Sequence, residues 1–105
     1  MNLSINNEWT QSEYLTQKNS LEKQGINVLL IDTILSPIDR IETILYNPIE
    51  LSKEPSTTIF VFYCDTGKSS LDRLEEYRQK FPNNRCISLK GGRAYWRKYM
   101  DIIDE

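Results

Sequence analysis

The chain is a short, slightly acidic polypeptide of 105 residues with a formal net charge of −2 at pH 7. This length suits one small domain, and the charge excludes a general electrostatic affinity for nucleic acid or anionic membranes. No apolar run approaches the about 20 residues that cross a bilayer, and residues 1–8 lack the basic start and apolar core of a signal peptide. We therefore expect a cytoplasmic protein, with neither nucleic acid nor a membrane as its partner.

Residues 10–25 have the signals of an amphipathic helix with a defined start. Thr10 and Glu13 have the spacing of a capping box, with Thr10 as the N-cap. The helix is expected to run to about Gln24, with Gly25 as its C-cap. The side chains expected on its buried side are Tyr14, Leu15 and Leu21.

The next segment predicts a buried strand followed by an irregular connection. Residues 26–32 are almost all apolar, as expected of a strand covered on both faces. Pro37 interrupts the pattern, and residues 38–46 fit either a short helix or an irregular loop. Pro48 and Pro55 frame a connection that is expected to contain a single helical turn.

The second half of the chain repeats the alternation of strand and helix. Residues 58–63 predict a second buried strand, after which Ser69 or Ser70 caps a helix that runs to about Lys80. The apolar side chains at helical spacing are Leu71, Leu74, Tyr77 and Phe81. A turn over residues 82–84 leads into a third strand.

The last elements are that strand, a tight loop and a final helix. The strand covers residues 86–89, the loop residues 90–92, and the helix holds Tyr95, Trp96 and Tyr99. We expect Trp96 to pack in the core rather than to contact substrate. Helices that alternate with strands predict an α/β fold with a mainly parallel central sheet flanked by helices. We expect one domain over residues 1–105.

Histidine is absent from the sequence, which narrows the possible mechanisms. The two cysteines, Cys64 and Cys86, are too few for a secreted disulfide scaffold. No Cys–His or Ser–His nucleophilic pair is possible within the chain, and the cysteine spacing fits no common zinc pattern. Any cysteine chemistry must be activated by the backbone, a helix terminus or a lysine. We expect no metal and no organic cofactor.

Cys64 is the residue most strongly placed for chemistry. It ends the buried strand 58–63 and precedes a polar loop and the next helix, at the sheet edge where α/β proteins bind ligands. Loop N–H groups and the helix dipole favour a thiolate there, and they also hold anions. Cys86 lies within an apolar strand and is expected to be a core residue. A redox pair of the two cysteines requires their strands to be neighbours.

Two segments together resemble the rhodanese domain. The first, Cys64-Asp65-Thr66-Gly67-Lys68-Ser69-Ser70, has the form Cys-x-x-Gly-x-x-Ser after a buried strand. The second, Leu89–Trp96, has the form Leu-x-Gly-Gly-x-x-x-Trp and follows about 25 residues later. Val28–Asp32 looks like the family's strand that ends in Asp. The resemblance is strongest over residues 25–99, and the size fits the short single-domain rhodaneses of bacteria.

This resemblance implies a sulfurtransferase that works through Cys64. The cysteine would take a sulfane sulfur from thiosulfate or a protein persulfide, and pass it as a persulfide to a thiol, cyanide or a sulfur-carrier protein. Gly67 would let the loop curl, and Lys68 would attract an anionic donor. The implied substrate-binding residues are Asp65, Thr66, Gly67, Lys68, Ser69 and Ser70.

The chain also departs from the family pattern. Thr33-Ile34 follows Asp32 where many members have x-Arg, and Ser69 stands where arginine is common. Asp65 puts a negative charge beside the thiol, which is expected to raise its pKa and repel an anionic donor. These departures favour one alternative, a catalytically weak or inactive binding module. A further alternative is a relay that accepts sulfur only from a protein donor. Asp32 either orients the active loop or simply ends its strand.

Phosphate chemistry is the less favoured interpretation of the same loop. Cysteine phosphatases of this fold need an arginine six residues after the cysteine to bind phosphate bidentately, and Ser70 occupies that position. A P-loop needs a glycine at the position of Phe62. We therefore expect neither phosphatase activity nor nucleotide hydrolysis.

Overall fold

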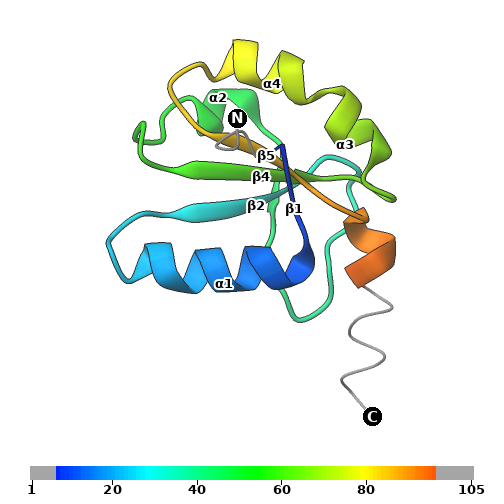
Figure 1. Cartoon of the computed structure of the whole chain (residues 1–105). Coiled ribbons are helices and arrows are strands. Elements are labelled where there is room, and N and C mark those ends of the chain that lie inside the picture. The colour runs from blue at the N-terminus through cyan, green and yellow to red at the C-terminus, as the bar shows by residue number, and fades with distance from the viewer. Residues whose placement is uncertain (1–6, 97–105) are drawn as a thin grey trace, which may run out of the picture.

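A five-stranded, all-parallel sheet forms the centre of the computed structural model, which describes residues 7–96 (Figure 1). The strand order is β1-β5-β4-β2-β3. The strands are β1 (Glu8–Trp9), β2 (Val28–Asp32), β3 (Ile44–Leu45), β4 (Ile59–Tyr63) and β5 (Cys86–Leu89). The α/β class with a parallel sheet flanked by helices is confirmed, and the arrangement is consistent with the rhodanese-like fold.

Helices cover both faces of this sheet (Figure 1). The helices are α1 (Gln11–Glu22), α2 (Pro48–Leu51), α3 (Lys68–Asp72) and α4 (Leu74–Lys80), and residues 92–96 are also helical. Helix α1 lies on one face, and α2, α3 and α4 lie on the other. Within residues 7–96 no helix has the length and apolar character to cross a membrane.

Strand β4 is the central strand, and its side chains alternate between two cores. Val61 packs in the core on the α1 face, together with Tyr14 and Trp96. Phe60 and Phe62 point the other way, into the core beneath α4. Burial on both faces explains why the predicted strands read as apolar runs without alternation.

The capping box of α1 is confirmed. Thr10 Oγ1 accepts a hydrogen bond from the N–H of Glu13 at 3.1 Å, and the N–H of Thr10 donates to Glu13 Oε1 at 2.8 Å. The helix ends at Glu22, so the predicted end at about Gln24 is two residues too late, and Lys23 rather than Gly25 is the C-cap. Gly25 lies in the following turn, with a φ of 85°.

The buried side of α1 differs in part from the prediction. Tyr14 is buried and Leu21 packs against the same core, as predicted. Leu15 is 39% exposed, so its predicted burial is wrong. Gln11 takes an inward position instead, because its Nε2 donates to the carbonyl oxygen of Lys90 at 2.9 Å. This contact connects the start of α1 to the end of β5.

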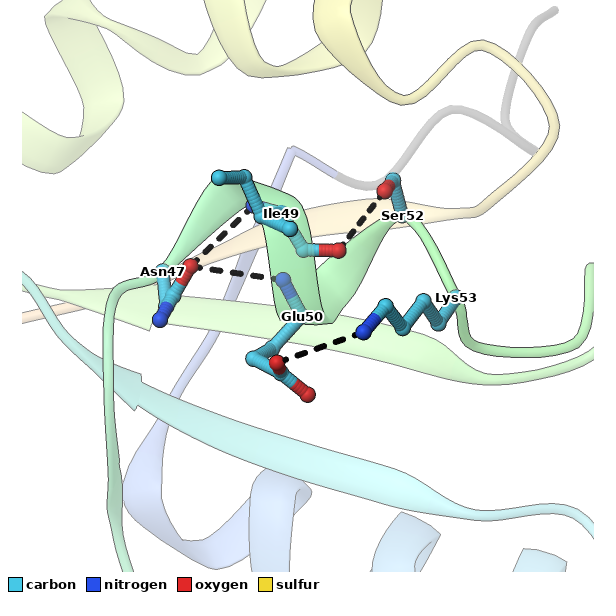
Figure 2. A network of polar contacts seen from close by, with 5 residues as sticks. All are labelled: Asn47, Ile49, Glu50, Ser52 and Lys53. Carbon is cyan, nitrogen blue, oxygen red and sulfur yellow. Dashed lines mark hydrogen bonds and ion pairs between the residues drawn. The ribbon is translucent and has the colours of Figure 1, made fainter.

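Helix α2 is the single turn expected between the two prolines. Asn47 Oδ1 accepts from the N–H groups of Ile49 at 3.1 Å and Glu50 at 3.3 Å (Figure 2), which caps the first turn. Pro48 follows the cap, where its missing N–H costs nothing. At the other end, Ser52 Oγ donates to the carbonyl oxygen of Ile49 at 2.8 Å.

The two edge strands were not predicted. Strand β1 pairs with β5 through Glu8↔Ser88 and Trp9↔Leu89, and Trp9 is only 2% exposed. Strand β3 pairs with β2 and lies inside residues 38–46, where the sequence favoured a short helix or a loop. Each strand has two residues, which is too short to show a periodic pattern.

The helix after Cys64 begins earlier than predicted and is broken. Gly67, with a φ of 90°, is the N-cap of α3, so neither Ser69 nor Ser70 caps it. Arg73 leaves the helical conformation and separates α3 from α4. Of the predicted inward side chains, Leu71 is 37% exposed, whereas Leu74, Tyr77 and Phe81 are buried. Tyr99 lies outside the described residues.

Candidate active site around Cys64

Cys64 directly follows β4, the central strand, so its sulfur lies at the carboxyl edge of the sheet. The chain curls around that sulfur. The N–H of Gly67 donates to Sγ at 3.1 Å and the N–H of Ser70 donates to it at 3.3 Å. A third hydrogen bond joins Sγ to Ser70 Oγ at 3.4 Å. Cys64 is 3% exposed, so these contacts replace water around the thiol.

The pKa of Cys64 reflects two opposing effects, the burial of the thiol and the hydrogen bonds to its sulfur. Burial by itself raises the pKa, because a thiolate is less well solvated in the interior. Hydrogen bonds from the Ser70 hydroxyl and from the N–H groups of Ser70, Gly67 and Thr66 act against burial and lower the pKa below its ordinary value. The predicted rise of this pKa by Asp65 is wrong: the pKa is lowered, and the Asp65 side chain is exposed to water. The site therefore favours a nucleophilic thiolate.

The loop of glycines after β5 holds the Cys64 loop in shape. Gly92 has a φ of 58°, and a Cβ there would collide with the carbonyl oxygen of Cys64 and lie 2.8 Å from the N–H nitrogen of Gly67. The N–H of Arg93 donates to the Cys64 carbonyl at 2.9 Å, and that of Ala94 to the Asp65 carbonyl at 2.8 Å. Gly91 and Gly92 of this loop therefore shape the site through backbone alone.

The predicted loop residues fall into two groups. Gly67 and Ser70 contact the sulfur directly, and Thr66 supports the thiolate through its N–H group. Asp65, Lys68 and Ser69 have exposed side chains. Lys68 Nζ lies 3.8 Å from Asp72 Oδ2 on the surface of α3, so part of its charge is compensated there.

Ser88 is a member of the site that the sequence did not identify. Its side chain is 0% exposed, and its Oγ lies 2.7 Å from Ser70 Oγ. The one signal in the sequence is a serine within the otherwise apolar strand Cys86–Leu89. That signal becomes informative only when the sheet register is known, because Ser88 is paired with Phe62, two residues before Cys64.

Asp32 stabilises the loop that directly follows β2, and not the Cys64 loop. Its carboxylate accepts from the N–H groups of Ile34 and Ser36, both at 2.8 Å. Tyr63 supports the same loop, because its hydroxyl donates to the carbonyl oxygen of Ser36 at 2.7 Å. Burial, and then the charge of Asp32, raise the pKa of Tyr63, so this hydroxyl stays protonated.

Cys86 is a core residue, as predicted. Burial raises the pKa of Cys86 to about 11, and Arg78 opposes that shift. Its strand is the neighbour of β4, but Cys86 is paired with Phe60, four residues before Cys64. At about 3.3 Å per residue this offset exceeds the reach of a disulfide. Both thiols are free, so the structure excludes the redox pair.

An open hollow lies beside the Cys64 loop. The active loop lines it with Thr66, Gly67 and Lys68, and the other lining residues include Glu8, Lys90 and Tyr95. Two lysines and Glu8 therefore give this hollow side chains of both charges, and Cys64 is not among the residues that line it. In the part of the chain that the structure describes, no three side chains of His, Cys, Asp or Glu lie together in a way that would hold a metal ion.

Comparison with known proteins supports the fold and goes no further. No protein-family model matches the chain, and no curated protein matches it. Among solved structures, the chain is similar to the BH2092 protein from Bacillus halodurans, with a TM-score of 0.56 and 17% sequence identity. The match covers 93% of this chain and 74% of that one. At this identity the likeness concerns the α/β fold alone.

Proposed function

We propose that the protein is a rhodanese-type sulfurtransferase of the cytoplasm that carries sulfane sulfur as a Cys64 persulfide. The observation that carries this proposal is the convergence of the Gly67 N–H and the Ser70 N–H on one buried sulfur, which is also hydrogen-bonded to the Ser70 hydroxyl. A structural cysteine needs no such set of donors. A thiolate or a persulfide does, because each carries negative charge that must be offset where water is excluded.

The reaction has two displacement steps at sulfur. In the first, the Cys64 thiolate attacks the outer sulfur of thiosulfate, the sulfur–sulfur bond breaks, and sulfite leaves with the bonding electron pair. In the second, a thiol, cyanide or sulfur-carrier acceptor attacks the outer sulfur of the persulfide, and Cys64 leaves as a thiolate. Both steps depend on a stable Cys64 anion, which the N–H groups of the loop provide.

We infer that these reactants approach Cys64 from the hollow beside its loop. Lys68 and Lys90 offer positive charge to an anionic donor such as thiosulfate, and Glu8 in the same hollow and Asp72 beside Lys68 reduce that charge. The exposed faces of Leu71 and Tyr95 offer apolar surface to a protein donor or acceptor. The proposed partners are therefore a small sulfur donor or a protein persulfide, and a thiol or sulfur-carrier acceptor.

Turnover with thiosulfate and cyanide tests this proposal. We expect the wild-type protein to form thiocyanate catalytically, and Cys64→Ser to form none, because a hydroxyl is too weakly acidic to replace the thiolate. Cys86→Ala is the matched control, since it removes the other cysteine, whose thiol stays protonated in the core. Equal turnover of wild type and Cys64→Ser would contradict the role of Cys64.

A binding module of the same fold is the second candidate, and the 3% exposure of Cys64 favours it. Such a module would keep the cysteine closed to reactants and use the surface around it. Alkylation of the folded protein by iodoacetamide separates the two functions. Modification of Cys64 at neutral pH supports the sulfurtransferase, whereas a thiol that reacts only after denaturation supports the binding module. Loading by a protein persulfide but not by thiosulfate would identify a relay.

A further inference from the structure

We propose that Ser88 is a positioning residue for the Cys64 nucleophile: when Cys64 is a thiolate, the buried Ser88 hydroxyl donates to Ser70, which in turn donates to the Cys64 sulfur. This inference deepens the proposed function, because it concerns the same nucleophile. It assigns a role to a residue of β5, on the neighbouring strand and outside the loop that surrounds the sulfur.

The three polar atoms form a chain that is closed to water. Ser88 is 0% exposed, Ser70 is 1% exposed and Cys64 is 3% exposed. Ser88 Oγ lies 2.7 Å from Ser70 Oγ, which lies 3.4 Å from Cys64 Sγ. Two packed elements, β5 and α3, hold the two serines. Buried hydroxyls of this kind must satisfy one another, since no solvent is available.

The number of protons determines the direction of each hydrogen bond. When Cys64 is a thiol, its S–H donates to Ser70 Oγ, and the Ser70 hydroxyl is free to donate to Ser88 or to the Gly67 carbonyl, 3.4 Å away. When Cys64 is a thiolate, the Ser70 proton must point at the sulfur. Toward Ser88, Ser70 Oγ can then act only as an acceptor, so Ser88 must donate the hydrogen bond. The proton lost on ionisation comes from Sγ, and each serine keeps its own hydroxyl proton.

Removal of the Ser88 hydroxyl therefore destabilises the thiolate form of Cys64 more than the thiol form. In the thiol form, the Gly67 carbonyl still accepts from Ser70 after Ser88 is lost. In the thiolate form, Ser88 is the one donor to Ser70 Oγ among the residues that the structure describes. A hydroxyl that accepts a hydrogen bond is also the stronger donor, because linked hydrogen bonds polarise one another. Ser88 thus acts on the sulfur through Ser70.

The ionisable groups around the sulfur do not obscure the effect of Ser88 on the ionisation of Cys64. Tyr77 of α4 is coupled electrostatically to Cys64, but burial raises the pKa of Tyr77, so it stays neutral wherever Cys64 titrates. The guanidinium of Arg73 opposes that rise. Asp65 and Lys68 of the loop have exposed side chains. Glu8 of β1 is paired with Ser88 in the sheet, and all five groups remain in the variants described next.

The test is the pH dependence of Cys64 alkylation by iodoacetamide in the folded protein, followed by intact mass. In Ser88→Ala we expect a midpoint at higher pH and a rate at about pH 6 that falls about 3- to 10-fold, with the high-pH plateau unchanged. Ser88→Thr keeps a hydroxyl and suits a strand, so its profile should follow the wild type. Cys86→Ala, on the same face of β5, should also leave the profile unchanged.

Two results would overturn the inference. One is a Ser88→Ala profile that coincides with the wild type. The other is an equal shift in Ser88→Ala and Ser88→Thr, which would identify packing rather than the hydroxyl as the cause. A double-mutant cycle gives a further check, because Ser88→Ala should have no effect on the profile in a Ser70→Ala background. Alkylation uses no sulfur donor, so the result for Ser88 stands apart from any failure of the proposed sulfur transfer.

Discussion

Replacing Gly92 with alanine is expected to lower the free energy of unfolding by about 3 kcal/mol or more and to abolish sulfur transfer. The new Cβ would collide with the carbonyl oxygen of Cys64 and approach the Gly67 nitrogen to 2.8 Å. Both are backbone atoms, so no flexible side chain can move aside. Relief of the clash must displace the Cys64 loop and with it the N–H groups that surround the sulfur. Chemical denaturation and thiocyanate formation measure the two effects.

Gly25→Ala is the matched control for Gly92→Ala. Gly25 also has a positive φ, of 85°, but a Cβ there meets nothing within 4 Å. We expect this variant to lose only about 1–2 kcal/mol, the cost of the left-handed backbone, and to keep its activity. If both variants lose the same stability and activity, close packing of the two loops is not what shapes the site.

Replacing Ser70 with alanine is expected to lower sulfur transfer at neutral pH by about 10- to 100-fold, since a hydrogen bond to a charged group contributes about 1.5–3 kcal/mol. The hydroxyl helps to hold the pKa of Cys64 below its ordinary value, and its loss raises that pKa. The thiolate fraction falls most below the wild-type pKa, and the two proteins converge as pH rises above the pKa of the variant. A pH–rate profile measures this change.

Ser69→Ala provides the comparison for Ser70→Ala. Ser69 is the adjacent residue in α3, but its side chain is exposed, so its removal should leave the pH–rate profile unchanged. If Ser69→Ala slows transfer as much as Ser70→Ala does, the decrease reflects a weakened α3 rather than a lost hydrogen bond to the sulfur. A Ser70→Ala profile that matches the wild type at every pH would also contradict our account.

The sequence predicted the parts of the fold that depend on local signals. Strands β2, β4 and β5 are apolar runs because both sheet faces are covered, and the start of α1 follows from the reciprocal Thr10–Glu13 contacts. Strands β1 and β3 escaped prediction because each has two residues, which become strands only by pairing with a longer neighbour. Trp9 shows the consequence, since it is buried in the core at a position that belongs to such a strand.

The candidate site was likewise predictable only where its residues are adjacent in sequence. Cys64 and its loop were predictable, because a strand end, a glycine and a following helix are adjacent in sequence. The start of α3 at Lys68 was not, because a left-handed Gly67 rather than a serine side chain precedes it. Ser88 was beyond reach from sequence, since its contact with Ser70 depends on the register of β4 and β5 and on the packing of α3.

The most direct measurement of the central claim is the intact mass of the protein after incubation with thiosulfate and removal of the excess. We expect the wild type and Cys86→Ala each to gain the mass of one sulfur atom, which cyanide then removes, and Cys64→Ser to gain nothing. Such a gain would show that Cys64 carries sulfur as a persulfide. A wild-type protein that gains no sulfur while Cys64 remains open to alkylation would contradict the thiosulfate sulfurtransferase.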